Sequence, residues 1–409
     1  MDTIDRDISA SIRLLMTEFP AVVVLGARQV GKSTLLHHLF PDIRRFDLEK
    51  QSDFDLVHHD IEFFLHTNPA PIIFDEAQLS PELFKALRVK IDQNRAISGQ
   101  YLLSGSSSPE LLHHISESLA GRIAICELDP FTWTEATHTP TSRFYDILTD
   151  QNWSDFAQLH PTHSFETLIQ RCVEGGYPEV VTKTHSTQFR QRWADNYIKT
   201  YIERDIRRLF PGLKLDSYRR FIQMLGMSSG QFINHSNLAR SLDVSQPTIK
   251  SYIDIASGTF LWRHLPVFCA NPLKSHTRMP KGYIRDSGLL CFMLNIHSKQ
   301  TLMNHPHFGF IWECFIAEQI LRNLTSRLIP YKAWAYRTDN QSEIDLIIEG
   351  PFGVIPIEIK SGISLRRPQL QAITHFMDTH KCPVGIVITN GSEGYQIGPN
   401  LVHVPAGCL

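Results

Sequence analysis

The chain has 409 residues, of which 42% are hydrophobic and 20% are charged, and its formal net charge is -2. This length predicts roughly two to four domains, and the near-neutral charge excludes a uniformly basic coat for nucleic acid while leaving room for local basic faces. Seven cysteines without a C-x-x-C pair, and the lack of any run of about 18 apolar residues, argue against a zinc cluster, a complete disulfide framework and a membrane span, so we expect a cytoplasmic protein with no membrane partner.

The first predicted domain, residues 1–135, has the pattern of an α/β domain. Short apolar runs recur along it, separated by stretches of helical periodicity, and these runs are 21–25, 71–74 and 101–103. Unbroken apolar runs of this length are typical of strands buried on both faces of a parallel sheet, and parallel strands need helical crossovers between them. We therefore predict a doubly wound parallel sheet.

The first apolar run leads directly into the pattern of a phosphate-binding loop, G-x-x-x-x-G-K-S. Glycines allow backbone N–H groups to turn toward phosphate oxygens, the lysine neutralises the charge of the β- and γ-phosphates, and the hydroxyl binds magnesium. ATP and Mg²⁺ are therefore the expected cofactors. The predicted nucleotide-binding residues are Gly26, Ala27, Arg28, Gln29, Val30, Gly31, Lys32, Ser33, Thr34 and Asp75, with Ser33 and Asp75 as magnesium ligands.

Hydrolysis of ATP requires an acid that holds the magnesium and a group that orients the attacking water. The second apolar run ends in two acids, and we expect Asp75 to hold the metal and Glu76 to polarise water, with Lys32 as a further catalytic group. Ser104 or Ser106, after the third run, could sense the γ-phosphate. Serine after a buried strand is also ordinary turn chemistry, so both interpretations stay open.

The charge that develops in the transition state calls for an arginine, supplied in cis or by a neighbouring subunit. Arg122 is the first choice, and Arg28, inside the loop, is the second. Each of them is equally compatible with an ordinary surface charge.

The middle of the chain changes character twice. Residues 136–225 are predicted to be mostly helical and to act as a lid or connector. Residues 226–285 contain a predicted helix-turn-helix, with helices at 236–242 and 245–253, and are expected to form a winged helix.

The second helix of this motif is the one that would enter the major groove of DNA. Ser245 suits the N-cap position and Pro247 the first turn. The residues predicted to contact DNA are Gln246, Thr248, Lys250 and Ser251. A lid or a protein contact is a nearly equal alternative, because a single lysine provides little charge for phosphate contacts.

Two further strands are predicted near the C-terminus, at 343–349 and 354–360. Alternate residues of a strand share a face, so pairing of these strands would bring Asp345, Glu358 and Lys360 together. Carboxylates that hold magnesium, with a lysine that positions water, are what cleavage of a phosphodiester requires. The alternative is an ordinary half-exposed strand, in which charged residues alternate with isoleucine.

Together these residues resemble one known group, the AAA-type P-loop ATPases of bacteria and archaea that carry a winged helix and a C-terminal domain like the PD-(D/E)XK nucleases. The match covers nearly the whole chain, and its landmarks occur in the family's order. The landmarks are residues 26–34, 72–78, 103–106, 116–122, 175–179, 201–206 and 285–290, followed by Asp345, Glu358 and Lys360.

The resemblance implies an α/β fold in four parts. These are a P-loop core at 1–135, a helical lid at 136–225, a winged helix at 226–285 and a restriction-endonuclease-like domain at 286–409. In PD-(D/E)XK enzymes a helix before the core strands contributes a further acid. Glu313 is the candidate, and Glu318 is an alternative that helical spacing does not separate from it. The implied magnesium site consists of Glu313, Asp345 and Glu358 with Lys360.

Three functions stay open. The first is an ATP-hydrolysing protein that couples nucleotide state to the binding or remodelling of duplex or branched DNA, as a homo-oligomer or ring in which Arg122 acts on a neighbour's nucleotide. The second is an ATP-gated, magnesium-dependent nuclease, although many ATPase-linked members of the group bind DNA without cutting it. The third is a nucleotide-dependent regulatory or defence switch with a non-catalytic C-terminal domain.

Overall fold

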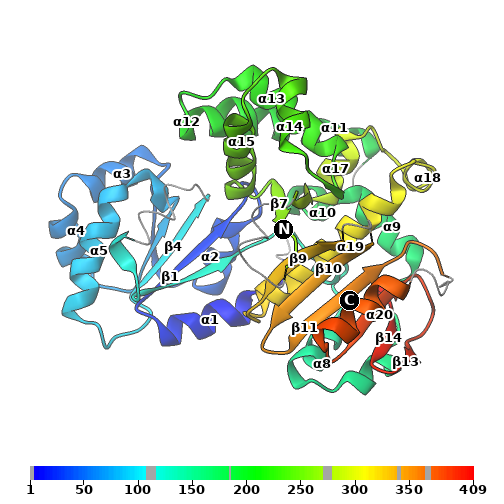
Figure 1. Cartoon of the computed structure of the whole chain (residues 1–409). Helices are drawn as coiled ribbons and strands as arrows, with labels where there is room; N and C mark the ends of the chain where they lie inside the picture. The colour runs from blue at the N-terminus through cyan, green and yellow to red at the C-terminus, as the bar shows by residue number, and fades with distance from the viewer. Residues whose placement is uncertain (1–3, 107–116, 184–185, 270–278, 339–341, 364–369) are drawn as a thin grey trace. The chain divides into compact units, whose positions relative to one another are not determined.

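The computed structural model describes residues 4–106, 117–183, 186–269, 279–338, 342–363 and 370–409. The chain forms two compact units, whose elements can be followed by colour in Figure 1. Unit 1 consists of Met1–Phe131, Gly258–Phe260 and Thr325–Leu328, and unit 2 consists of Thr132–Ser257, Leu261–Leu324 and Ile329–Leu409. The boundary predicted near residue 135 lies close to the end of the first segment of unit 1, and the three later predicted parts lie largely in unit 2.

Unit 1 is built around a five-stranded sheet with the order β2-β3-β4-β1-β5, in which neighbouring strands run parallel. The strands are β1 (Ala21–Gly26), β2 (Arg44–Asp47), β3 (Ile72–Asp75), β4 (Tyr101–Ser106) and β5 (Ile123–Glu127). All residues of β1 and β3 are buried, as unbroken apolar runs predict for strands covered on both faces. The predicted parallel α/β domain is confirmed.

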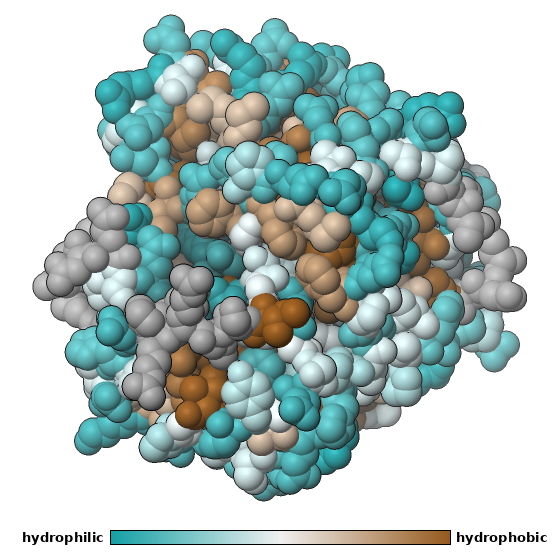
Figure 2. All heavy atoms as spheres, turned by 90° about the vertical axis from the view of Figure 1, so that its right-hand side faces the viewer, coloured by the Kyte–Doolittle hydropathy of each residue, from teal (hydrophilic) through white to brown (hydrophobic). Residues whose placement is uncertain are grey.

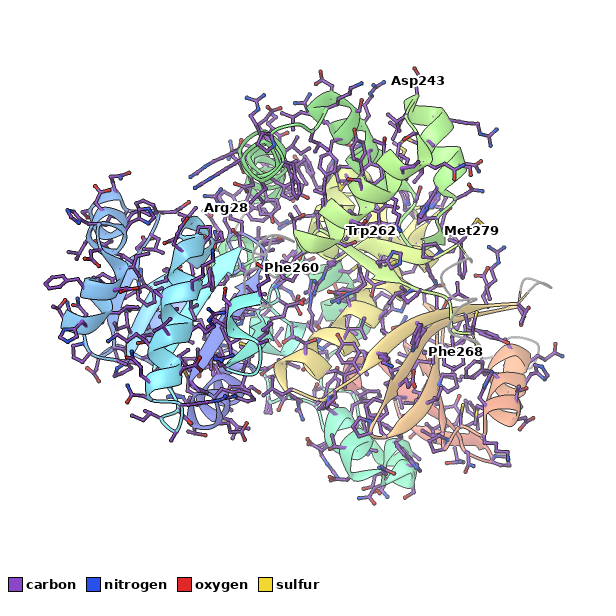
Figure 3. All side chains as sticks on the ribbon, turned by 60° about the vertical axis from the view of Figure 1, so that its left-hand side comes forward. Arg28, Asp243, Phe260, Trp262, Phe268 and Met279 are labelled. Carbon is purple, nitrogen blue, oxygen red and sulfur yellow. The ribbon has the colours of Figure 1, made fainter. Side chains whose placement is uncertain are left out.

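Helices cover both faces of this sheet (Figure 1). They are α1 (Ser9–Glu18), α2 (Lys32–Leu39), α3 (Gln51–His58), α4 (Ile61–Thr67) and α5 (Pro81–Gln93), with a 3-10 turn η1 (Ala77–Leu79). The apolar sides of α3, α4 and α5 join a core that contains Val23, Phe74 and Leu103 of the central strands. Phe260, from one of the two later segments of unit 1, packs against the same core and is labelled in Figure 3.

The first part of unit 2 is helical, as predicted. Its helices are α7 (Trp133–Thr137), α8 (Phe144–Asp150), α9 (Phe165–Glu174), α10 (Pro178–Thr182), α11 (Thr187–Thr200), α12 (Arg207–Leu209) and α13 (Leu215–Met227), with a 3-10 helix η2 (Trp153–Gln158). Between α11 and α12 the chain forms a π-helical turn, η3 (Tyr201–Ile206). The sequence predicts an ordinary charged helix there, because side-chain periodicity over one turn does not reveal a change in the backbone hydrogen-bond pattern.

A helix-turn-helix follows, accompanied by a three-stranded antiparallel sheet in which β8 is the middle strand. The helices are α14 (His235–Leu242) and α15 (Gln246–Gly258), and the strands are β6 (Gln231–Phe232), β7 (Trp262–Leu265) and β8 (Lys281–Ile284). Ser245 Oγ accepts the backbone N–H of Thr248 at 3.3 Å, so the predicted N-cap is confirmed. Asp243, with φ 53°, belongs to the turn between the helices and lies at the surface (Figure 3).

The last part of unit 2 contains a mixed six-stranded sheet with the order β13-β14-β12-β11-β10-β9. Its strands are β9 (Lys332–Arg337), β10 (Glu343–Gly350), β11 (Gly353–Ile359), β12 (Gly385–Thr389), β13 (Tyr395–Gly398) and β14 (Leu401–Pro405). The helices of this part are α17 (Ser287–Met293), α18 (Lys299–Met303), α19 (Phe308–Ser326) and α20 (Gln371–His380), with a 3-10 turn η5 (Ala406–Cys408). Ile347, Phe376 and Val387 are among the residues that form the core between the sheet and α20.

Large hydrophobic side chains at the surface are spread along the chain, and they include Leu56, Phe63, Met227 and Ile363. Figure 2 shows one face of the molecule, on which hydrophilic residues predominate and hydrophobic ones occur in small groups. No helix within the described residues is long and apolar enough to cross a membrane.

Candidate nucleotide site and carboxylate cluster

The predicted phosphate loop lies between strand β1 and helix α2. Gly26 ends the strand, and a Cβ at this position would lie 2.3 Å from the carbonyl oxygen of Leu128, so only glycine fits. Gly31, with φ 93°, is the residue before the helix and has a left-handed backbone that favours glycine. The first backbone N–H groups of α2 have no partner within the helix and point along its axis, which is the usual basis of phosphate binding.

Lys32 is buried inside this loop, with 5% of its surface exposed. Its Nζ donates hydrogen bonds to the carbonyl oxygens of Gly26 and Ala27, each at 3.1 Å. A residue outside the loop also stabilises it, because Arg6 Nη1 donates a hydrogen bond to the carbonyl oxygen of Val30 at 3.1 Å. Arg6 was not predicted as a site residue. Of the other loop residues, Gln29 and Thr34 are exposed and Arg28 pairs with Glu49 at 3.3 Å, so Arg28 does not point at a phosphate in this conformation.

The ends of strands β3 and β4 bring the predicted acids and serines together. The Ser104 hydroxyl donates a hydrogen bond to Asp75 Oδ1, and Asp75 is 2% exposed. Glu76 follows with a left-handed backbone, φ 54°, which is costly for a residue with a side chain and is often found at functional positions. Ser106 Oγ donates to Glu76 Oε2 at 3.4 Å. Both serines therefore contact the acids, and their role in sensing the γ-phosphate stays a prediction.

Gln78 is a site residue that sequence reasoning passed over. Its side-chain amide donates to Glu76 Oε2 at 2.5 Å and to Ser106 Oγ at 3.0 Å. These hydrogen bonds to Oε2 fix the orientation of the Glu76 side chain. Its second carboxylate oxygen, Oε1, is a further hydrogen-bond acceptor. Gln78 lies inside a landmark segment of the resemblance, 72–78, and its spacing of two from Glu76 is the only signal that could have found it.

Arg45 of strand β2 is a second unforeseen residue, and it connects the loop to Asp75. Its Nη1 donates to the carbonyl oxygen of Ser33 at 3.3 Å, and its Nη2 lies 3.9 Å from Asp75 Oδ2. The Arg45 guanidinium thus contacts both residues that were predicted to bind magnesium, Ser33 and Asp75. Nothing in the local sequence marks Arg45, because it follows another arginine, Arg44, in a short strand at the edge of the sheet.

Arg122 lies at the opposite edge of the sheet from the phosphate loop. It directly precedes β5, which pairs in parallel with β1 from Ala21 onward, whereas Gly26 ends β1. Five residue steps along β1, at about 3.3 Å each, separate the two edges by about 17 Å. The Arg122 guanidinium instead binds Asp92, with Nε–Oδ1 2.7 Å and Nη2–Oδ2 2.9 Å. The prediction that Arg122 acts in cis is therefore wrong, and action on a neighbour's nucleotide stays a prediction.

The predicted DNA-contacting residues lie at the start of α15. Gln246, Lys250 and Ser251 are exposed, whereas Thr248 is half-buried. The Thr248 hydroxyl forms a hydrogen bond with Ser245 Oγ at 2.8 Å, so it belongs to the helix cap. Asp254, one turn after Lys250, is also exposed, and this face of α15 therefore carries mixed charge.

Exposed basic residues gather instead on α12 and α13, which lie largely within the segment 136–225 that was predicted to be a lid or connector. Arg207, Arg208, Arg219 and Arg220 are exposed there. Arg219 Nη1 binds Asp216 at 3.0 Å, and Arg207 Nη2 lies 3.5 Å from Glu203 Oε2. This surface, α12 with α13, has more arginine than the predicted recognition helix.

The acids predicted near the C-terminus also come together, and we call Glu313, Asp345, Glu358 and Lys360 the carboxylate cluster. Lys360 Nζ lies 2.5 Å from Glu358 Oε1 and 3.6 Å from Asp345 Oδ2. Asp345 Oδ2 also accepts the backbone N–H of Ile359 at 2.9 Å. Glu313, on α19, adds a third carboxylate, close enough to Asp345 for their charges to interact.

Lys281, from strand β8, enters the carboxylate cluster without having been predicted. Its Nζ lies 3.4 Å from Glu313 Oε2 and 3.5 Å from Asp345 Oδ1. Burial, together with the charge of Asp345, raises the pKa of Glu313 to about 8, and the same two causes raise the pKa of Glu358 to about 7. Burial opposes the ionisation of Asp345 as well, but the charges of Lys281 and Lys360 outweigh it and lower the pKa of Asp345.

Glu318, the alternative to Glu313, has a different role. It is buried and contacts three arginines: Arg263 Nη2 at 2.7 Å, Arg285 Nε at 2.9 Å and Arg322 Nε at 3.7 Å. It is therefore the centre of an ion-pair network, and Glu313 is the acid of α19 that joins the cluster.

The cluster does not match the predicted magnesium site in one respect. Among the residues that the structure describes, no group of three or more His, Cys, Asp and Glu side chains is arranged to hold a metal ion. The physical reason is visible in the contacts, because the ammonium of Lys281 lies between two of the three acids. The predicted metal coordination by Glu313, Asp345 and Glu358 is accordingly corrected for this conformation.

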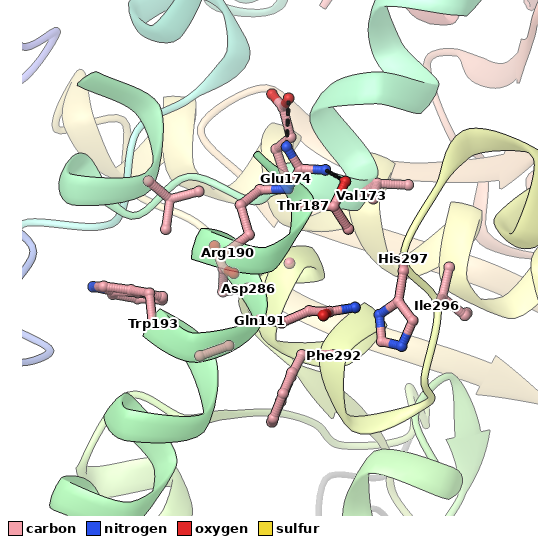
Figure 4. A pocket seen from close by; sticks show the side chains of 13 residues that line it. Val173, Glu174, Thr187, Arg190, Gln191, Trp193, Asp286, Phe292, Ile296 and His297 are labelled. Carbon is pink, nitrogen blue, oxygen red and sulfur yellow. Dashed lines mark hydrogen bonds and ion pairs between the residues drawn. The ribbon is translucent and has the colours of Figure 1, made fainter. Parts of the chain in front are cut away.

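Two other landmark segments, 175–179 and 285–290, contact each other beside a pocket of unit 2 that Asp286 and Gly288 help to line, shown in Figure 4. The pocket has about 380 Å³ of empty space, including its open mouth. Asp286 accepts the backbone N–H groups of Gly176 at 2.8 Å and Leu289 at 2.9 Å, and a Cβ at Gly175 would lie 2.4 Å from its Oδ1. The motifs at 175–179 and 285–290 thus bind each other, which explains their residue types structurally.

The parallel sheet, the left-handed glycine before α2 and the buried loop lysine define the class of unit 1: it is a P-loop domain of the AAA type. In agreement, residues 18–137 match a family described as AAA domain, residues 165–300 match a domain of unknown function (DUF8612), and residues 308–409 match another (DUF4143). The AAA domain implies binding of ATP, usually with Mg²⁺.

Two curated relatives resemble the chain over almost its whole length. They are Uncharacterized protein Rv2008c of Mycobacterium tuberculosis and Uncharacterized protein Mb2031c of Mycobacterium bovis, each 31% identical over 405 residues, covering 98% of this chain and 83% of the relative. The chain belongs to the family of these two proteins, with an AAA P-loop domain followed by two domains of unknown function.

Solved structures resemble the chain more distantly. The Walker-type ATPase PABY2304 of Pyrococcus abyssi is 15% identical with a TM-score of 0.45, covering 72% of this chain and 96% of that one. The RuvB Holliday junction branch migration motor of Thermotoga maritima is 17% identical with a TM-score of 0.31, covering 67% and 95%. Scores below 0.5 carry no functional argument.

Proposed function

We propose that unit 1 binds and hydrolyses ATP. The observation that carries this proposal is the meeting of Asp75, Glu76, Ser104 and Ser106 at the ends of two neighbouring strands, with Arg45 in contact with both Ser33 and Asp75. A structural turn would not need two buried or half-buried acids at this edge, because an unused buried carboxylate costs free energy.

The residues present fit an ATP–magnesium complex. The loop offers backbone N–H groups at the start of α2 and the ammonium of Lys32 for the phosphates, while the Ser33 hydroxyl and Asp75 would hold the metal. Bound magnesium supplies neutralisation of phosphate charge. Glu76, oriented through Oε2 by Gln78, would hold a water with its other carboxylate oxygen and take its proton. Arg45 would stabilise negative charge that develops on the phosphates in cis.

The test is ATP turnover by the full chain and by Glu76→Gln. Glutamine keeps the size and hydrogen bonds of the side chain but takes no proton, so turnover falls by about 10²- to 10⁴-fold while ATP still binds. Glu82→Gln, at an exposed position of α5, is the matched control and leaves turnover unchanged. A Glu76→Gln protein with normal turnover would remove Glu76 from the reaction, and a wild-type chain that neither binds nor hydrolyses ATP would refute the proposal.

For the role of ATP we propose that nucleotide state controls the binding of DNA by unit 2. Support comes from the exposed start of α15 and from the arginines of α12 and α13, because positive side chains on adjoining helices suit a phosphate backbone. DNA would then stimulate ATP turnover. Alanine at Gln246, Lys250 and Ser251 together would reduce this stimulation, whereas Lys299→Ala, on α18, would not.

The rival function is a regulatory switch in which the helix-turn-helix binds a protein. ATP turnover that is the same without DNA as with single-stranded, duplex or junction DNA would favour this rival.

A homo-oligomer is part of the first proposal, since Arg122 lies far from the phosphate loop of its own chain and could act only on a neighbour. If the homo-oligomer is required, ATP turnover per chain rises with protein concentration, and this rise is lost in Arg122→Ala.

A further inference from the structure

The carboxylate cluster combines side chains from two different sheets of unit 2. Lys281 is the first residue of β8, the middle strand of the three-stranded sheet that accompanies the helix-turn-helix. Asp345 and Glu358 belong to the six-stranded sheet, and Glu313 belongs to α19. An ammonium from one sheet therefore reaches acids that another sheet carries, 64 residues away in the case of Asp345.

The contacts of Lys281 are those of an internal counter-ion. Its side chain is 5% exposed, and its Nζ lies almost equally far from Glu313 Oε2, at 3.4 Å, and from Asp345 Oδ1, at 3.5 Å. A buried ammonium and a buried carboxylate cost less free energy when they pair with each other than when each is left without a partner. Lys281 and the acids therefore stabilise one another in this conformation.

One oxygen of the cluster is left over. Glu358 is 6% exposed, and its Oε1 binds Lys360 at 2.5 Å. Its Oε2 is buried and has no hydrogen-bond partner within the part of the chain that the structure describes. Buried carboxylate oxygens are almost always bonded. Glu358 Oε2 is therefore an acceptor of the cluster that the two lysines leave unused.

We propose that Lys281 takes the place of a divalent cation in the carboxylate cluster. Mg²⁺ and Mn²⁺ bind carboxylate oxygens at about 2.0–2.2 Å and need several of them at once. The Lys281 ammonium lies between two of the three acids that would provide these oxygens, and its positive charge repels a second cation at this distance. The cluster therefore excludes divalent cations while β8 is in place, and it becomes a divalent-cation site when the ammonium is removed.

The experiment counts Mn²⁺ ions bound to the full chain without nucleotide, by the electron paramagnetic resonance signal of free Mn²⁺. Lys281→Met keeps most of the side-chain volume and removes the charge. We expect this variant to bind one more Mn²⁺ per chain than the wild type, and Mn²⁺ to raise its Tm. The matched control, Lys299→Met, removes a surface lysine that pairs with Glu166 outside the cluster, and it binds no more Mn²⁺ than the wild type.

A second substitution assigns the new site. Asp345→Asn in the Lys281→Met background abolishes the extra Mn²⁺, because it removes a carboxylate of the cluster. The proposal is overturned if folded Lys281→Met binds no more Mn²⁺ than the wild type. It is also overturned if Asp345→Asn alone removes a Mn²⁺ from the wild-type chain, since the cluster would then hold metal beside Lys281. This second comparison needs no Lys281 variant, so it decides the question even where Lys281→Met does not fold.

Discussion

The phosphate loop of unit 1 and the carboxylate cluster of unit 2 are both charged sites, but they are assembled differently. The residues of the loop, Gly26 to Ser33, are consecutive in sequence and connect one strand to one helix. The carboxylate cluster takes its acids from α19, β10 and β11 and its unforeseen cation from β8. A site made of neighbouring residues has its geometry fixed by local backbone conformation, whereas a site made of distant residues depends on how whole elements pack.

The largest expected effect concerns the assembled charges of unit 2. Glu318→Gln removes the carboxylate that Arg263, Arg285 and Arg322 share. Arg285 and Arg322 are buried, and breaking such a buried pair costs about 3–5 kcal/mol. Urea unfolding followed by tryptophan fluorescence measures this loss in unit 2 alone, because all 6 tryptophans of the sequence lie in that unit.

The control for this prediction is Glu343→Gln, which removes a half-exposed partner of Arg337 and costs about 0–1 kcal/mol. Equal unfolding midpoints for the two variants would show that the arginines around Glu318 find other partners, and the idea of a network centred on Glu318 would then be wrong.

The next effect concerns the local site of unit 1. Lys32→Ala removes the ammonium of the phosphate loop, and ATP turnover falls by about 10²- to 10³-fold, the range seen when one donor to developing charge is lost. Unit 2 stays folded, so the tryptophan signal does not change. Lys85→Ala, at an exposed position on α5, serves as the control. Loss of the tryptophan signal in Lys32→Ala would mean that the two units do not unfold separately.

A smaller effect is expected for Arg45→Ala. Hydrogen bonds to charged groups contribute about 1.5–3 kcal/mol, so turnover falls by about 10- to 100-fold while ATP binding changes little. The neighbouring Arg44→Ala is the matched control, because the Arg44 guanidinium stacks over Phe46 at 5.5 Å instead. If the two variants lose turnover equally, the contacts of Arg45 with Ser33 and Asp75 have no catalytic role.

The smallest effect concerns the helix-turn-helix. Ser245→Ala removes the side chain that accepts the Thr248 N–H, and loss of such a cap costs about 1 kcal/mol. Tryptophan fluorescence in urea detects a shift of this size. Ser236→Ala, at an exposed position within α14, has no cap to lose and leaves the midpoint unchanged. A larger shift for Ser236 than for Ser245 would contradict the assignment of the cap.

Local signals account for what the sequence predicted well. Apolar runs ending at Gly26 and Asp75 place the strands of unit 1, because a strand buried on both faces has no other composition. The sequence itself argues against action of Arg122 in cis, because a residue before a parallel strand lies at the edge of the sheet opposite to a residue after one. The period of two along β10 and β11 placed Asp345 and Glu358 correctly for the same local reason.

Lys281 and Arg45 could not be found in this way. Lys281 is the first residue of a strand of four residues, and its sequence neighbours, Pro280 and Gly282, favour a turn. The acids that it contacts, Glu313 and Asp345, lie 32 and 64 residues further along the chain. Arg45 contacts Ser33, which lies 12 residues earlier, in the first turn of helix α2. Both contacts arise from the packing of elements, and periodicity within one element carries no information about them.

The two short later segments of unit 1 have a consequence for dissecting the protein. The chain passes between the units at 131–132, 257–258, 260–261, 324–325 and 328–329, which makes five covalent crossings. A fragment ending at Phe131 would lack Phe260, which packs against the core of unit 1, and the Ser326 carbonyl oxygen that accepts the Ser11 hydroxyl at 2.6 Å. Unit 1 is therefore discontinuous in sequence, and excising it requires that three pieces of chain be joined by new loops.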